Sequence, residues 1–144
     1  MPKIFGSSLL AILLATVAFY MLGFIWYSFL FADQWMHLTG ITEADALIRG
    51  EQLGAMMYVW GVLITLLQVL GIAAVLNWAG ATRLITCVKI AVMLAVMIVL
   101  PVLGYGMLYQ DVSIHLVGID FLHLLIGYSL AAVIISFFRS NDNK

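Results

Sequence analysis

Two titratable side chains, Asp120 and His123, lie in the last apolar stretch of the chain. A carboxylate within a bilayer costs about 2.5–3.5 kcal/mol on insertion scales, so we expect Asp120 to be paired inside the protein. His123 follows three residues later, which places it on the same helix face. Such a pair could exchange a proton near neutral pH. Two interpretations stay open: a structural Asp–His hydrogen bond joined by a tyrosine from another span, and a site that handles a proton or a ligand.

Gln68 and Tyr105, in two other apolar stretches, complete this candidate polar site. Gln68 follows Gly61 by seven residues, a spacing that favours hydrogen bonding between helices over ligand binding. His115 lies about 140° around the helix from Asp120, too far for one metal ion, so we expect no metal. The chain contains no nucleophile elbow, phosphate loop, His-Glu-x-x-His or Cys-x-x-Cys. We therefore expect no enzymatic activity and no cofactor.

Several aromatic residues fall in one half of the predicted spans. An aromatic belt normally marks both membrane interfaces, so an excess on one side is more than a belt requires. Some of these rings could line a cavity above Asp120. The residues of this outer aromatic cluster are Trp26, Tyr27, Trp35, Tyr58 and Trp60.

The elements that must position these residues follow from composition. Of 144 residues, 65% are hydrophobic and only 9% are charged, which excludes a soluble globular domain. The net charge of −1 excludes a nucleic-acid binder. A spanning helix needs about 20 apolar residues. We therefore expect an all-α bundle of four transmembrane helices, one domain over residues 1–144, with spans near 4–30, 54–77, 84–109 and 114–138.

Lysine and arginine predict the orientation of these spans. One side carries Lys3, Arg83, Lys89, Arg139 and Lys144, whereas the other carries Arg49 alone. We expect both termini in the cytoplasm and the loop 31–53 outside. The first apolar run is too long for a cleaved signal peptide, so we expect it to remain as a span.

The loop 31–53 has helical signals of its own. The aromatic segment from Phe31 to Leu38 is typical of an interfacial stretch, and Gly40 suits a turn. Thr42 and Asp45 fit a capping box, which predicts a short helix from Glu43 to about Ile48. Two interpretations stay open: a loop lying on the membrane, and a lid over a pocket between the spans.

The stretch GFIWYSFLFADQWMHLTGITEADAL resembles the signature of a family of small bacterial membrane proteins, domain-of-unknown-function family seventeen-sixty-one. Its Gly-x-x-Trp-Tyr is similar to Gly23, Trp26 and Tyr27, and its Trp and Leu-Thr-Gly are similar to Trp35 and residues 38–40. The last helix of the family begins with an Asp, which Asp120 resembles. The resemblance implies four spans and the bacterial cytoplasmic membrane, and it implies no activity.

Three functional hypotheses remain. The first is a non-catalytic membrane protein that packs or binds, as a homo-oligomer or an accessory subunit of a larger complex in the lipid bilayer. The second is a small proton-linked transporter or channel that uses Asp120 and His123. The third is a binder of a lipid, quinone or pigment in the outer aromatic cluster.

Overall fold

The computed structural model describes residues 2–141, so Lys144, one of the orienting charges, lies outside the described residues. Four helices are long and apolar enough to cross a membrane. They cover Leu9–Leu30, Ala55–Trp78, Leu84–Tyr109 and Ile114–Arg139. The prediction of an all-α fold with four transmembrane helices is confirmed.

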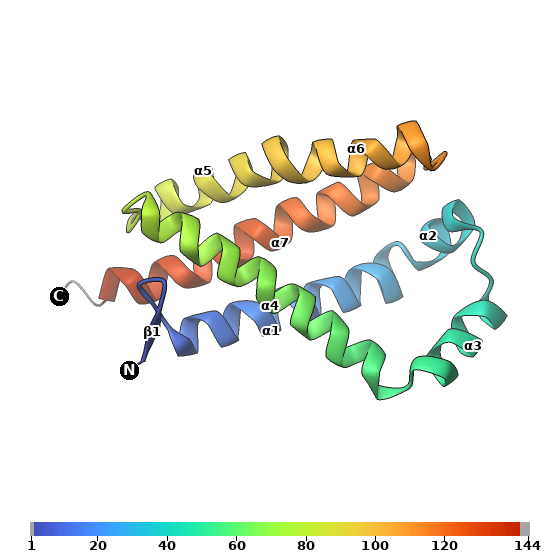
Figure 1. Ribbon diagram of the computed structural model, residues 1–144, viewed down its shortest axis with the longest axis horizontal. Helices are drawn as coiled ribbons and strands as arrows, with labels where there is room; N and C mark the ends of the chain where they lie inside the picture. The colour runs from blue at the N-terminus through green and yellow to red at the C-terminus, as the bar shows by residue number, and fades with distance from the viewer. Residues whose placement is uncertain (1, 142–144) are drawn as a thin grey trace.

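The elements follow one another in a simple order (Figure 1). A short hairpin precedes the first span, two helices fill the loop after it, and two spans contain a π-helical turn. The elements are β1 (Lys3–Ile4), β2 (Ser7–Ser8), α1 (Leu9–Ile25), η1 (Trp26–Leu30), α2 (Ala32–Thr39), α3 (Glu43–Leu53), α4 (Ala55–Trp78), α5 (Leu84–Leu94), η2 (Ala95–Val99), α6 (Leu100–Tyr109) and α7 (Ile114–Asn141).

The predicted start of the first span, near residue 4, is wrong. Strands β1 and β2 pair antiparallel around a turn in which Phe5 (φ 48°) and Gly6 (φ 67°) are left-handed. Helix α1 begins only after Ser8, whose hydroxyl accepts a hydrogen bond from the amide of Ala11 at 3.1 Å. A serine cap of this kind satisfies a free amide of the first turn and so fixes the helix start.

The packed core lies at the end of the bundle where both chain termini are found (Figure 1). We call this the terminal end, and the opposite end, which holds α2 and α3, the loop end. At the terminal end α1, α4 and α7 pack together, and α5 packs along α7. Alanines allow these helices to approach closely. The fully buried alanines of this core are Ala15, Ala73, Ala91, Ala131 and Ala132.

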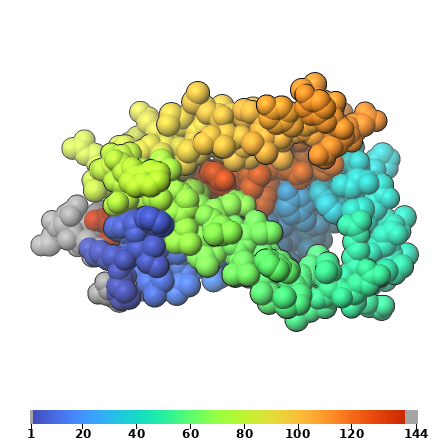
Figure 2. All heavy atoms as spheres, viewed as in Figure 1, coloured from blue at the N-terminus to red at the C-terminus, as the bar shows by residue number. Residues whose placement is uncertain are grey.

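Helix α4 diverges from the bundle toward the loop end (Figure 1). Its second half contributes Val69, Ile72 and Leu76 to the core, whereas every residue from 51 to 60 is exposed. The space-filling view shows α1 recessed between α4 and the loop helices, and α7 visible between α4 and α5 (Figure 2). Helix α4 therefore leaves openings on both of its sides.

The loop helices confirm the capping prediction. The Thr42 hydroxyl accepts from the Asp45 amide at 3.2 Å, and the Asp45 carboxylate accepts from the Thr42 amide at 2.9 Å. The same carboxylate also accepts from the Thr42 hydroxyl at 2.6 Å, and this bond, followed by the bond from the Thr42 amide, holds the pKa of the Asp45 carboxyl below its usual range. Gly40, at φ 69°, ends α2 as predicted. Helix α3 is longer than predicted, because it continues through Gly50 to Leu53.

Arg139 joins the two ends of the chain at the terminal end. Its guanidinium is buried, with 7% of the residue exposed. It donates to the Ser7 hydroxyl and to the carbonyls of Phe5, Ala73 and Ala81, at 2.7–3.2 Å. The sequence analysis used Arg139 only as an orienting charge. In the fold, it holds the N-terminal hairpin, α4 and the 79–83 turn together.

Candidate functional site

Tyr27 of η1 joins the two titratable residues of α7. Its hydroxyl donates to Asp120 Oδ1 at 2.8 Å and lies 3.5 Å from His123 Nδ1. The tyrosine expected from another span is therefore Tyr27. The expected direct Asp120–His123 hydrogen bond is wrong for the described residues, because the Tyr27 hydroxyl lies close to both side chains and takes the place of that bond.

A π-helical turn, η1, contains Trp26 and Tyr27, whose rings both contact His123. The amide of Phe31 donates to the carbonyl of Trp26, five residues back, at 2.9 Å. The rings of Trp26 and Tyr27 lie 6.0 and 5.1 Å from the His123 ring. Consecutive residues of a regular α-helix point about 100° apart, so the wider turn lets both rings face α7. Such turns are frequent at functional sites.

Two glycines let α1 and α7 approach each other. A methyl group on Gly127 would overlap the Phe19 ring, so the ring packs directly on the α7 backbone. A methyl group on Gly23 would come within 3.0 Å of His123 Nε2. Gly23 is part of the Gly-x-x-Trp-Tyr motif. The motif thus combines close helix approach with the two rings that contact His123.

A cavity of about 410 Å³ lies between α1, α4 and α7, where α4 diverges. Three buried polar atoms among the described residues have no hydrogen-bond partner: Trp26 Nε1, Gln68 Oε1 and His123 Nε2. The side chains of Gln68 and His123 both line the cavity. An unpaired buried polar atom costs about 1–3 kcal/mol, so this wall favours a molecule that can pair with it. The other lining residues include Tyr20, Gly23, Tyr27, Ser28, Met57, Tyr58, Gly61 and Thr65.

The structure divides the predicted aromatic cluster. Trp26 is buried, with 7% exposed, and Trp35 packs edge-on against Tyr27 with ring centroids 6.0 Å apart. Tyr58 lines the cavity but is 60% exposed. Trp60, 57% exposed, lies on the diverging half of α4. Of the predicted cluster, Tyr27 and Tyr58 line the cavity, Trp26 and Trp35 pack beside Tyr27 and His123, and Trp60 lies apart from them.

Tyr105 does not belong to the polar site. It is 60% exposed and stacks on Tyr109, with ring centroids 6.0 Å apart. It is not among the residues that line the cavity, and it has no hydrogen bond to Tyr27, Asp120 or His123 among the described residues. Its inclusion in the candidate site is therefore wrong.

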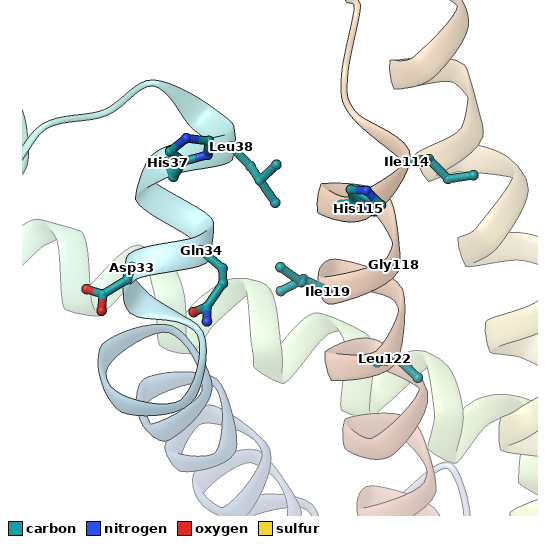
Figure 3. A pocket seen from close by; sticks show the side chains of 9 residues that line it. All are labelled: Asp33, Gln34, His37, Leu38, Ile114, His115, Gly118, Ile119 and Leu122. Carbon is teal, nitrogen blue, oxygen red and sulfur yellow. The ribbon is translucent and has the colours of Figure 1, made fainter.

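A second hollow, of about 780 Å³, lies between α2 and α7 at the loop end (Figure 3). Leu38 and Ile119 point toward each other across it, and His37 and His115 lie at its upper part. No group of three or more His, Cys, Asp or Glu side chains that could hold a metal ion is found within the described residues. Aliphatic side chains from α2 and α7 line most of this hollow, and they include Leu38, Ile119 and Leu122.

Two features of the site were not predicted. Tyr27 was assigned to the aromatic cluster, and its hydroxyl proved to be the partner of Asp120. The divergence of α4 opens the cavity. It could not be predicted, because the sequence of α4 is apolar along its whole length. Gln68 was expected to hydrogen-bond between helices, and this is wrong for the described residues, because its Oε1 has no partner and its side chain lines the cavity.

A bundle of four membrane-spanning helices, with a Tyr–Asp–His cluster beside a lateral cavity, defines this chain as a multi-pass membrane protein. The chain belongs to the protein family of unknown function DUF1761, whose model matches residues 10–136. The match confirms the family expected from the Gly23–Gly40 region. The comparison with curated proteins and the comparison with solved structures each found no match.

Proposed function

We propose that this protein is a non-catalytic binding protein of the membrane, and that the cavity between α1, α4 and α7 takes an amphipathic small molecule of the lipid or quinone class. The observation that carries the proposal is the pair of buried, unpartnered polar side chains, Gln68 and His123, in the wall of an otherwise mainly apolar cavity. Ligand pockets typically have about 300–1,000 Å³ and a few polar groups that fix orientation.

The position of the cavity supports a ligand from the bilayer. Gln68 lies about 20 Å along α4 from Ala55, near the middle of the span. The opening beside the diverging half of α4 therefore faces hydrocarbon. We propose that the protein acts in the bacterial cytoplasmic membrane, with both termini in the cytoplasm.

Native mass spectrometry after mild detergent extraction tests this function. We expect the parent protein to retain a bound molecule, and Thr65→Phe, which fills the cavity, to lose it. Thr65 bonds only its own helix, to the Gly61 carbonyl, so its replacement costs little packing. Val62→Phe, on the exposed side of α4, is the matched control. Equal retention by Thr65→Phe and the parent would contradict the proposal.

The same measurement bears on partners. We propose that the protein works as a homo-oligomer or as an accessory subunit, because the exposed half of α4, which carries Trp60, offers a helix face without an intramolecular partner among the described residues. Oligomers or a second protein in the native spectra would support this part. A monomer in native membranes, measured by cross-linking, would contradict it.

A second candidate is a small proton-linked transporter or channel. The Tyr27–Asp120–His123 cluster favours it, because it joins three exchangeable groups. Purified protein in liposomes should then change internal pH, and Asp120→Asn should abolish this change while folding remains intact. Absence of a pH change in protein that retains its ligand would leave the binding function alone.

A further inference from the structure

A smaller hollow of about 230 Å³ lies between α4, α7 and the α5–η2 segment, along the same face of α4 as the cavity. We call it the narrower hollow, and the cavity of about 410 Å³ the wider hollow. Gln68 lines both hollows. The α4 residues that line the two are Met57, Tyr58, Gly61, Thr65 and Gln68, and then Gln68, Gly71, Ile72 and Val75. Most of these positions recur every three or four residues, which is one helix face.

The other walls continue in the same way. On α7, His123 and Leu124 line the wider hollow and Tyr128 lines the narrower one. Residues 57 and 75 of α4 are about 27 Å apart along the helix axis. The two hollows therefore share Gln68 and one face of α4, and the one toward the terminal end is smaller and more apolar.

The hydrogen bonds of the cluster indicate what the polar part accepts. The single Tyr27 proton is donated to Asp120, so the Tyr27 oxygen can only accept from His123 Nδ1. A neutral His123 that donates from Nδ1 has Nε2 as an acceptor. Nε2 packs beside Gly23, which also lines the wider hollow.

Gln68 adds a second acceptor. Its Oε1 is buried and has no partner, and its side chain lines both hollows. The residues lining the two hollows include no lysine or arginine. The two free acceptors, Gln68 Oε1 and His123 Nε2, favour a head group that donates hydrogen bonds, and the lack of a cationic lining residue disfavours an anionic head group.

We infer that the site binds a neutral, single-chain amphiphile whose head group donates hydroxyl protons to Gln68 and His123, while its chain runs along Ile72 and Val75 into the narrower hollow. The inference rests on the proposed function and names the ligand class. Acylglycerols and prenylated quinols share this chemistry.

The head group is tested with matched probes on the purified parent protein in nanodiscs of phosphatidylcholine. Binding of an eighteen-carbon monoacylglycerol is compared with that of its di-O-methyl ether and of the fatty acid with the same chain. Binding of a prenyl quinol is compared with that of its quinone, which has acceptors alone. We expect the hydroxyl-bearing member of at least one set to bind at least roughly tenfold more tightly, the effect of one hydrogen bond to a buried acceptor. The set that shows the difference identifies the source.

The chain position is tested at Gly71. Gly71 lines the narrower hollow and a Cβ there meets nothing within 4 Å, so we expect the side chain of Gly71→Leu to occupy this hollow. Gly104→Leu, at an equally open glycine outside both hollows, is the control. We expect Gly71→Leu to weaken the eighteen-carbon probe at least roughly tenfold, to leave a ten-carbon probe nearly unchanged, and to unfold at the temperature of the control.

Gln68→Leu separates the two parts of the inference. We expect it to weaken the hydroxyl probe only part of the way to the affinity of its ether, because His123 still accepts one proton, and to leave the ether unchanged. Equal binding of hydroxyl, ether and acid probes, or insensitivity of the long probe to Gly71→Leu, would overturn the inference while the binding function stands. Failure of every probe to bind, with no ligand retained from the membrane, would overturn the proposed function itself.

Discussion

Tyr27 is the residue on which the polar cluster depends, because it alone comes from the first span, at η1, while Asp120 and His123 come from α7. A short carboxylate inside a span needs a donor nearby, and the Tyr27 hydroxyl is that donor. The sequence predicted the need for a tyrosine, since Asp120 and His123 lie on one helix face. It could not predict which tyrosine, because helix rotation at a π turn is set by tertiary packing.

Substitutions of Asp120 measure how much the Tyr27–Asp120 hydrogen bond contributes to stability. Asp120→Asn keeps an oxygen that accepts from Tyr27, so we expect only modest destabilisation. Asp120→Leu leaves a half-buried hydroxyl without its acceptor, and we expect a further loss of about 1–3 kcal/mol. Thermal unfolding in detergent measures both variants. In a Tyr27→Phe background the difference between them should shrink, and a difference that persists would show that Asp120 is stabilised by another group.

Trp26 is expected to stabilise the loop end of α1. It is buried between Phe31 and His123, with ring centroids at 4.7 and 6.0 Å. Trp26→Ala should therefore lower the free energy of unfolding by roughly 3–5 kcal/mol, as for other buried aromatic truncations. Trp60→Ala, at an exposed position, is the matched control. Equal melting temperatures for the two variants would contradict the packing described for Trp26.

At the scale of elements, capping residues were predicted more accurately than helix bends. The Thr42–Asp45 capping box and the Gly40 turn are local patterns, so the sequence was sufficient for both. The hairpin before α1 was missed because its stability comes from Arg139, which is 132 residues away from Ser7. The two π turns were missed because long apolar runs carry no mark of them.

Helix α3 should lose stability in acid. The hydrogen bonds from Thr42 lower the pKa of Asp45. The ionised carboxylate is therefore more favourable in the folded helix than in the unfolded segment. This stabilisation is present above the ordinary carboxyl value of about 3.9 and is lost as pH falls through the lower, folded pKa. Hydrogen exchange of the α3 amides should therefore show reduced protection factors at the lowest pH. Asp45→Asn should remove this pH dependence, and an unchanged profile would contradict it.

Arg139→Gln should destabilise the terminal end. The variant removes a charged group that donates four hydrogen bonds, and we expect a loss of at least about 1.5–3 kcal/mol, the value of one charged hydrogen bond. Arg83→Gln, at an exposed arginine, is the control for net charge. Proteolysis near Phe5 and calorimetry measure the two effects. Similar values for both variants would show that the hairpin is held by apolar contacts.

At the scale of the whole molecule, the number of spans was predictable and the shape of the bundle was not. Hydrophobic length alone defines four helices, since lipid requires every backbone group to be paired within a helix. Which helix diverges depends on packing. Alanines and Gly127 bring α1, α5 and α7 together, whereas α4 keeps large side chains such as Met57 and Trp60 in its diverging half.

Both termini lie at one end of the bundle, and charge predicts that this end is cytoplasmic (Figure 1). In a Cys87→Ala background, a cysteine introduced at the exposed Ala44 should react with a membrane-impermeant reagent in intact cells. A cysteine introduced at exposed Thr82 should react only after the membrane is opened. The reverse pattern would contradict the predicted orientation.

The contacts of Arg139 also impose an order on biosynthesis. The ribosome makes the hairpin before the arginine that holds it, and the first three spans are translated in between. Until then the Phe5 carbonyl and the Ser7 hydroxyl must rely on water or on the insertion machinery. The first segment of the chain therefore reaches its final position only when translation of the fourth span is complete, and a nascent chain stalled before residue 139 should still expose its N-terminal hairpin to protease.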